Sequence, residues 1–315
     1  MSPVAPDEQL HLSNQRAVAK ALSAIERGGE AAEALLRSLE GRAGQARTAG
    51  VTGAPGVGKS TLVQALGREL LADGALAVLA VDPSSPFTGG ALLGDRVRMP
   101  ELVASGAFVR SMATRGALGG LATATGDAID LLDAAGFSWV IVETVGVGQA
   151  EVDIAGEVDT VIVVTVAGLG DDVQTAKAGL LEIGDIFAVN KADRAGADAQ
   201  VELLEAMLAL RPPGGWQPPV ISVSGLSGEG VCELAAALRA HHGYLDGDGQ
   251  RAELRRQRAR RRLERVFAAL AWEQARRRHG ARIDELSAAV AAGRIDVYTA
   301  AHVLLGRGRG DGEDA

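Results

Sequence analysis

Cysteine and aromatic residues are scarce in this chain of 315 residues. Its one cysteine, Cys232, excludes an internal disulfide and a metal site built from several cysteines. Aromatic residues make up 3% of the chain, too few for the stacked platforms that bind single-stranded nucleic acid. We therefore expect no nucleic-acid partner. The low cysteine content fits a reducing compartment, and we expect the protein in the cytoplasm.

Long apolar runs are also missing. No stretch reaches the ~20 apolar residues that a membrane-spanning helix needs. Residues 1–8 lack the pattern of a secretory signal. We therefore expect no membrane partner. The net charge of −8 and the hydrophobic content of 47% are those of an ordinary globular chain.

Lysine is the third scarce residue. The chain has 32 basic residues, and all but Lys20, Lys59, Lys177 and Lys191 are arginine. The planar guanidinium cannot easily replace a compact ammonium, so a remaining lysine is a candidate for a chemical role. Two of the four, Lys59 and Lys191, lie in motifs that indicate nucleotide binding.

The first motif is a glycine-rich loop of the form G-x-x-x-x-G-K-[ST]. It consists of Gly53, Ala54, Pro55, Gly56, Val57, Gly58, Lys59 and Ser60, followed by Thr61. An apolar run precedes it and a helical pattern follows, which is the context that a phosphate-binding P-loop needs. Backbone N–H groups of such a loop bind phosphates. We expect Lys59 to reach the β- and γ-phosphates and to act in catalysis, and Ser60 to bind Mg²⁺.

The second motif is Asn190-Lys191-Ala192-Asp193, which follows an expected strand over Asp185–Asn190. This is the N-K-x-D element that reads guanine. The Asp193 carboxylate would accept from both N1–H and N2–H of guanine, and adenine offers no such pair of donors. We expect Ser224, Gly225 and Leu226, after the last strand, to complete the base pocket with backbone groups.

Three carboxylates occupy the ends of expected strands or the loops beyond them: Asp82, Asp95 and Glu143. Mg²⁺ favours oxygen ligands, and the carboxyl edge of a parallel sheet is where such sites form. We expect a metal role for Glu143 and Asp95, and a metal or water-positioning role for Asp82. The alternatives are a cap before Pro83 for Asp82 and an ion pair with a nearby arginine for Asp95.

Glu143 also begins a second pattern, Glu143-Thr144-Val145-Gly146. It resembles the D-x-x-G element of GTPases with Glu in place of Asp and two spacers. The Gly146 N–H would contact a γ-phosphate, so the loop would switch with nucleotide state. No glutamine follows Gly146 directly, which predicts slow intrinsic hydrolysis or a water held by another group.

Strands alternate with helical stretches through the middle of the chain, which predicts an α/β fold with a doubly wound, mostly parallel sheet. We expect an N-terminal helical segment (1–45), a P-loop GTPase domain (46–245), a C-terminal helical arm (250–305) and a disordered tail (306–315). Within the arm, helices are expected over 251–278, 282–292 and 296–305.

The arm begins with a strongly basic segment. Residues 251–278 contain eleven Arg and three Glu. One side of the expected helix carries Leu254, Leu263, Val266, Phe267 and Leu270. We expect these to pack on a partner helix in a homodimer, with the arginines facing solvent. Contact of the arginines with an acidic partner stays an alternative.

Several strings together resemble the MeaB/ArgK-type GTPases, the family of the methylmalonic aciduria type A protein. They are residues 81–86, 89–96, 114–121 and 143–149. The resemblance covers roughly residues 10 to 305. It implies a Mg²⁺-dependent, homodimeric hydrolase of GTP to GDP. It also implies a chaperone of an adenosylcobalamin-dependent acyl-CoA mutase, above all methylmalonyl-CoA mutase, which gates cofactor loading and protects or reactivates the mutase. Residues 168–177 would form a further switch, with Lys177 either in it or merely solvated.

Four other classes share the P-loop core. A nickel-insertion GTPase should carry a His-rich tract or paired Cys. A partition ATPase should carry Lys where Ala54 stands. A signal-recognition GTPase would need a larger helical bundle or a Met-rich domain. A kinase acting on an amino-acid transport protein, as the older ArgK name implied, is the alternative that stays open, although no separate phosphoacceptor site is evident.

Overall fold

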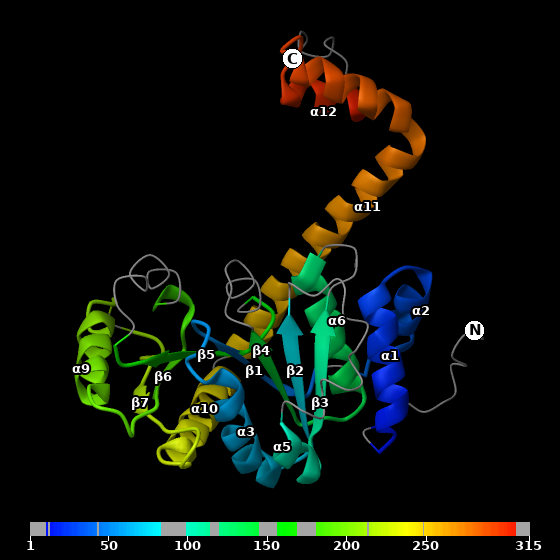
Figure 1. Ribbon diagram of the computed structural model, residues 1–315. Coiled ribbons are helices and arrows are strands. Elements are labelled where there is room, and N and C mark those ends of the chain that lie inside the picture. Colours follow the sequence, from blue (N-terminus) through cyan, green and yellow to red (C-terminus); the bar gives the residue numbers. More distant parts are fainter. Residues whose placement is uncertain are drawn as a thin grey trace. The chain divides into compact units, whose positions relative to one another are not determined.

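The computed structural model describes residues 11, 13–42, 44–82, 99–113, 120–144, 156–168, 181–212, 214–247 and 249–306. The chain divides into two compact units, Met1–Arg260 and Arg261–Ala315. The first unit holds the sheet and the helices that cover it (Figure 1).

The first unit is built on a seven-stranded sheet. Its strands are β1 (Arg47–Thr52), β2 (Leu76–Asp82), β3 (Phe108–Ala113), β4 (Trp139–Thr144), β5 (Thr160–Val166), β6 (Ile186–Asn190) and β7 (Val220–Ser222). They lie in the order β3-β2-β4-β1-β5-β6-β7, and each neighbouring pair is parallel. The carboxyl ends of all strands therefore meet at one edge. The predicted α/β fold with a parallel sheet is confirmed.

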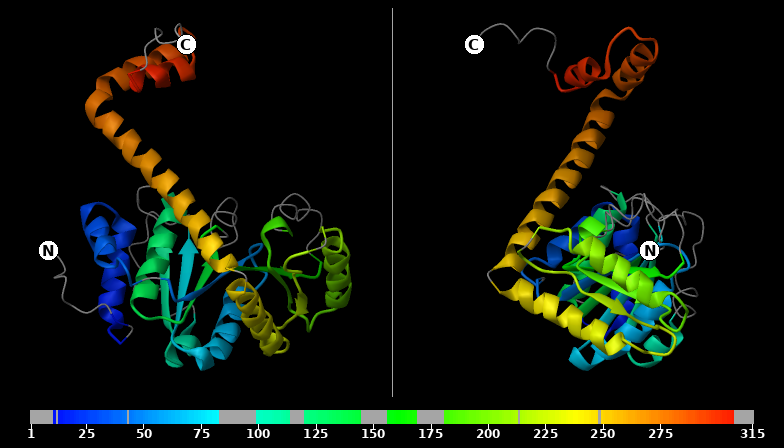
Figure 2. Two further views of the ribbon diagram at one scale, coloured as in Figure 1. Left: turned by 180° about the vertical axis from the view of Figure 1, so that it is seen from behind. Right: turned by 90° about the vertical axis from the view of Figure 1, so that its left-hand side faces the viewer.

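Helices cover both faces of this sheet. They are α1 (Gln15–Arg27), α2 (Glu30–Ser38), α3 (Lys59–Leu70), the 3-10 turn η1 (Leu71–Asp73), α5 (Pro100–Ala104), α6 (Gly120–Ala134), α9 (Ala197–Leu208) and α10 (Val231–Asp246). One apolar core lies under α1, α6 and α9, and the other under α3, α5 and α10 (Figure 2). Successive residues of β2 alternate between the two: Leu79 is in the first core and Val78 in the second. Strands buried on both faces explain the continuous apolar runs of the sequence.

The N-terminal helices form where the sequence predicts them. The Asn14 side chain accepts a hydrogen bond from the Ala17 N–H and so begins α1. Gly28 ends α1 at a φ of 66°, which favours glycine. A buried ion pair of 2.9 Å between Glu26 and Arg110 joins α1 to β3.

The segment after α10 is α11 (Gln250–Ala291), which consists of two helices joined at a kink. The kink lies at His279, whose φ of −131° departs from helical values, so the helix break expected after residue 278 is confirmed. The first turns of α11, up to Arg260, belong to the first unit. In the second unit, α11 is followed by α12 (Val297–Leu304), which the Asp296 carboxylate caps. Within the described part of the chain, no helix is both long and apolar enough to cross a bilayer.

Candidate functional site

The P-loop sequence joins the end of β1 to the start of α3. Gly53, at a φ of 141°, lies so close to β5 that a Cβ there would overlap the Val164 carbonyl. Gly58, at a φ of 91°, is followed directly by the first residue of α3. Both positions thus require glycine for backbone and steric reasons. The first N–H groups of a helix have no partner within the helix itself, so the start of α3 suits the binding of an anion.

Lys59 lies across the loop that it follows. Its ammonium donates to the carbonyls of Gly53 at 2.6 Å and Ala54 at 3.0 Å. The residue is buried, with 6% of its surface exposed. The Lys59 ammonium is therefore held against the loop whose N–H groups would bind phosphate. Its compact positive charge lies where the phosphates would be.

Ser60 and Glu143 meet at the carboxyl edge of the sheet. The Ser60 hydroxyl donates to the Glu143 carboxylate, and Glu143 is buried, at 4% exposed. A hydroxyl and a carboxylate are oxygen ligands of the kind that Mg²⁺ selects, and the ion normally keeps several waters. No group of three His, Cys, Asp or Glu suited to a metal exists among the described residues. Two oxygen ligands of this kind suit Mg²⁺ better than a transition metal.

Asn190 connects the two predicted motifs. Its side-chain amide donates to the Val57 carbonyl at 2.8 Å, and its oxygen accepts from the Gly225 N–H at 3.0 Å. A Cβ on Gly58 would lie 2.5 Å from this amide nitrogen. One buried side chain thus fixes the P-loop to both the end of β6 and the segment after β7.

The residues after Asn190 turn sharply. Lys191 has a φ of 60°, and among the described residues it is the one non-glycine residue with a positive φ. Its ammonium donates to the Gly56 carbonyl at 2.7 Å, which ties it to the P-loop as well. The Asp193 carboxylate accepts from the Ser224 hydroxyl at 3.1 Å. The positive φ of Lys191 is a strained backbone conformation, which persists where surrounding contacts hold it.

Ser224, Gly225 and Leu226 lie beside both motifs. A Cβ on Gly225 would be 2.9 Å from the Leu62 nitrogen and 3.2 Å from the Thr61 carbonyl carbon, so the segment packs directly on α3. Ser224 is buried, whereas Leu226 is 88% exposed. The structure thus brings these three residues together with Gly53–Thr61, Asn190, Lys191 and Asp193.

Other predicted site residues are not placed by the structure. The backbone of Asp82 ends β2 at the same edge of the sheet, but its side chain is not among those described. Asp95, Gly146 and the segment around Lys177 lie outside the described residues.

Thr144 is a polar contact that the sequence pattern does not reveal. The pattern treats it as a spacer after Glu143, but its hydroxyl donates to the Thr52 hydroxyl at 3.3 Å, and both residues are buried. The contact joins the end of β4 to the residue that precedes the P-loop. Only the pairing of β4 with β1 brings the two together, so no local sequence signal could have shown it.

Comparison with known proteins decides the family. The model of the family "Methylmalonyl Co-A mutase-associated GTPase MeaB" matches residues 15–278. The chain belongs to this MeaB family. The predicted resemblance is confirmed, and the chain is a GTP hydrolase with a P-loop NTPase fold.

Relatives of this MeaB-family chain include a Pyrococcus horikoshii protein named as a GTPase, 45% identical over 304 residues, which are 95% of this chain and 96% of the relative. The mouse methylmalonic aciduria type A homolog, a mitochondrial protein, is 38% identical over 65% of this chain and 51% of its own length. Among solved structures, one described as an LAO/AO transport system kinase has a TM-score of 0.71 and 26% identity, covering 96% of this chain and 95% of that chain.

Proposed function

We propose that this MeaB-family GTPase is the chaperone of an adenosylcobalamin-dependent acyl-CoA mutase, with methylmalonyl-CoA mutase as the first candidate. The observation that carries the proposal is the match of the MeaB family model over residues 15–278. The likeness to the mouse methylmalonic aciduria type A homolog supports it. In this function the GTPase gates cofactor loading and protects or reactivates the mutase in the cytoplasm.

The nucleotide would bind along the P-loop with its base between Asn190 and Ser224. The N–H groups of Gly53–Thr61 and the Lys59 ammonium would bind the β- and γ-phosphates. The Asp193 carboxylate, oriented by the Ser224 hydroxyl at 3.1 Å, would accept from N1–H and N2–H of guanine. Each interaction places a fixed charge or dipole where the ligand carries the opposite one.

Ser60 and Glu143 would hold Mg²⁺, together with Asp82 and Asp95 as further candidates. When bound, the ion would supply charge that offsets the negative charge developing on the phosphates. The contact between Ser60 and Glu143 holds the serine oxygen at the start of α3. Lys59 and Asp82 or Glu143 would serve the hydrolytic step by orienting the phosphate and the attacking water, and Gly146 would contact the γ-phosphate.

A homodimer formed through the C-terminal helices would complete this function. Leu263 and Phe267 of α11 are each 69% exposed, and with Leu270 they follow the i, i+4, i+7 spacing of one helix face. Exposed apolar stripes of this kind are typical of helices that pack on a partner. We propose no role for nucleic acid or for a membrane.

The alternative is a kinase that acts on an amino-acid transport protein. It is kept because a structure that covers 96% of this chain is described as an LAO/AO transport system kinase. The two functions differ in where the phosphate goes. A chaperone GTPase releases it to water, whereas the kinase would transfer it to a bound protein.

The deciding experiment is phosphate release from GTP by the full chain, with and without purified adenosylcobalamin-dependent mutases of the same host. Slow release alone and strong stimulation by one mutase are expected, and they would identify the client. Lys59→Ala with the same mutase gives the background. Absence of stimulation by every mutase would contradict the chaperone function, and labelled phosphate on a transport protein would support the kinase.

A further inference from the structure

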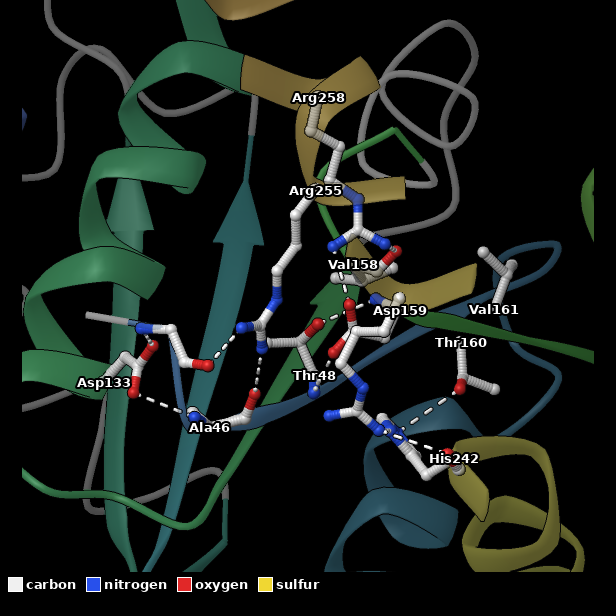
Figure 3. A network of polar contacts seen from close by, with 12 residues as sticks. Ala46, Thr48, Asp133, Val158, Asp159, Thr160, Val161, His242, Arg255 and Arg258 are labelled. Carbon is white, nitrogen blue, oxygen red and sulfur yellow. Dashed lines mark hydrogen bonds and ion pairs between the residues drawn. The ribbon is translucent and has the colours of Figure 1, made fainter. Parts of the chain in front are cut away.

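Three arginines of α11 contact the first unit on the side opposite the P-loop, two of them at the edge of the sheet and one at α10. We call residues Gln250–Arg260 the α11 root. Figure 3 shows two of these arginines, Arg255 and Arg258, pointing from α11 towards the starts of β1 and β5. The third, Arg251, contacts the end of α10. All three lie in the first compact unit.

Arg258 forms a buried ion pair. Its guanidinium is 2.7 Å from the Asp159 carboxylate, and the two side chains are 12% and 1% exposed. Asp159 also accepts from the Thr48 N–H at 3.2 Å, while the Thr48 hydroxyl accepts from the Asp159 N–H at 2.7 Å. The starts of β1 and β5 are thus joined to each other and to α11.

Arg255 holds the segment that leads into β1. It donates to the carbonyls of Gly44 and Ala46. The Asp133 carboxylate, at the end of α6, accepts from the N–H groups of the same segment, including that of Ala46 at 2.8 Å. Donors and acceptors of one short segment are therefore satisfied from two helices (Figure 3).

Arg251 contacts a buried imidazole. Its Nη2 is 2.9 Å from Nδ1 of His242 and 3.2 Å from the His242 carbonyl oxygen. A guanidinium carries donors only. Nδ1 of His242 must therefore accept, so the ring proton of a neutral His242 lies on Nε2. That nitrogen is 3.3 Å from the Thr160 hydroxyl and donates to it.

The Thr160 hydroxyl connects the His242 ring to a second imidazole, that of His241. The Thr160 hydroxyl is 2.7 Å from Nδ1 of His241, and Thr160 is fully buried. This hydroxyl accepts from His242, and its own hydrogen is available for Nδ1 of His241. The proton of His241 then lies on Nε2, which is 3.6 Å from the Asp185 carboxylate. The chain of hydrogen bonds runs in one direction, from Arg251 to Asp185.

We propose that Arg251 sets the donor-to-acceptor direction of this whole series of hydrogen bonds. We also propose that the α11 root stays bound to the sheet only while His241 and His242 are both uncharged. Arg251 is thus a positioning residue, which acts on the sheet through two imidazoles and one hydroxyl. A proton added to Nδ1 of His242 would oppose the Arg251 N–H. A proton added to Nδ1 of His241 would leave the Thr160 hydroxyl without its acceptor in a buried place.

Four charged groups act on the two imidazoles: Arg47 at β1, Asp159 before β5, Asp185 before β6 and Arg251 of α11. Two further charged groups lie behind them, because Asp246 pairs with Arg251 and Arg258 pairs with Asp159. Burial lowers the pKa of His241 to about 4 and that of His242 to about 3, with Asp159 opposing and Arg251 reinforcing the effect. The geometry and the charges therefore favour the same uncharged pair at neutral pH.

The first test uses the native sequence apart from the exposed histidines. His11, His279 and His302 are replaced by Gln, which leaves two imidazoles in the full chain. Proton–nitrogen correlation spectra of ¹⁵N-histidine-labelled protein should show the Nε2–H tautomer for both rings and no titration above about pH 5. An Nδ1–H tautomer at His242, or titration near pH 6.5, would overturn the proposal. This test needs no change in the network itself.

The second test removes the donor. In Arg251→Met, Nδ1 of His242 is no longer opposed by a guanidinium, so the pKa of His242 should rise by about one unit or more, a tenfold change in proton affinity. The protection factors of the amides over residues 249–260, which are exchange rates divided into the intrinsic rates at each pH, should then begin to fall at a higher pH than in the native chain. Arg256→Met is the matched control, because Arg256 is 79% exposed and pairs with Glu253 on the same helix. An unchanged His242 titration in Arg251→Met would contradict the proposed role of Arg251.

Discussion

The side-chain amide of Asn190 donates to the carbonyl of Val57 over 2.8 Å, although the two residues are 133 positions apart. This contact joins the N-K-x-D motif to the P-loop, which we propose to form one nucleotide site. A substitution in the P-loop or in the N-K-x-D motif should therefore lower the affinity for the whole nucleotide.

Gly58→Ala should weaken GTP binding strongly. The new Cβ would lie 2.5 Å from the Asn190 amide nitrogen, at a φ of 91° that disfavours any side chain. Backbone strain alone costs of order 1–3 kcal/mol, so we expect affinity to fall by about tenfold or more. Gly56→Ala is the matched comparison, because its φ is 79° but nothing lies within 4 Å of its Cβ. Equal losses in the two variants, measured by calorimetric titration, would rule out the clash with Asn190.

Asp193→Asn should change base preference. The amide can no longer accept from both N1–H and N2–H of guanine, but it can donate to the 2-oxo group of xanthine. Affinity for GTP should fall by roughly 10- to 100-fold, the value of a charge-assisted hydrogen bond, while XTP binding improves. Competition binding measures both. Asp198→Asn, at the exposed start of α9, is the control. Unchanged GTP affinity in Asp193→Asn would contradict base recognition by Asp193.

Arg258→Met should destabilise the first unit by about 3–5 kcal/mol, because it leaves the Asp159 carboxylate buried without its counter-charge. Burial alone would raise the pKa of Asp159, but the charge and hydrogen bond of Arg258, together with the charge of Arg251 and the His242 ring, lower that pKa below its ordinary value. The double variant Asp159→Asn with Arg258→Met should lose less than the sum of the single variants. Urea unfolding gives these free energies. Strict additivity would show that the ion pair contributes nothing of its own.

Stability should fall as the solution is acidified from pH 6.5 towards pH 4. The folded pKa values of His241 and His242 lie near 4 and 3, below the ordinary 6.5. The unfolded chain therefore binds more protons in this range, and the stability present above pH 6.5 is lost. Asp185 has the opposite effect on stability, because burial raises its pKa to about 6. The effect of this one carboxyl is smaller than the combined effect of the two imidazoles. Replacing both histidines by Asn should flatten the profile. A free energy of unfolding that rises on acidification would contradict this balance.

Most of the fold and of the candidate site could be predicted from short stretches of sequence. The P-loop and the N-K-x-D motif each specify a turn and its chemistry within a few residues, so the sequence alone predicts their places at strand ends. Alternation of apolar strands and helices likewise predicts the parallel sheet. The strand expected over Asp185–Asn190 is found as β6, one residue shorter at its start.

Contacts between distant positions could not be predicted in this way. Periodicity alone assigned the arginines of 251–278 to the solvent-facing side of a helix. This was wrong for Arg251 and Arg258, whose side chains are 13% and 12% exposed. Asp159, the partner of Arg258, is 99 residues away. Only the order of the strands brings the start of β5 under α11.

The buried ion pair of Arg258 also determines where the GTPase domain can be shortened. A protein that stopped at the turn after α10 would retain the sheet but lose Arg251, Arg255 and Arg258. The Asp159 carboxylate would then lose its counter-charge, and the carbonyls of Gly44 and Ala46 would lose a hydrogen-bond donor. A protein that ends at Arg260 keeps all of these contacts. The smallest independently soluble GTPase from this chain should therefore include eleven residues, Gln250–Arg260, of a helix whose remainder lies in another unit.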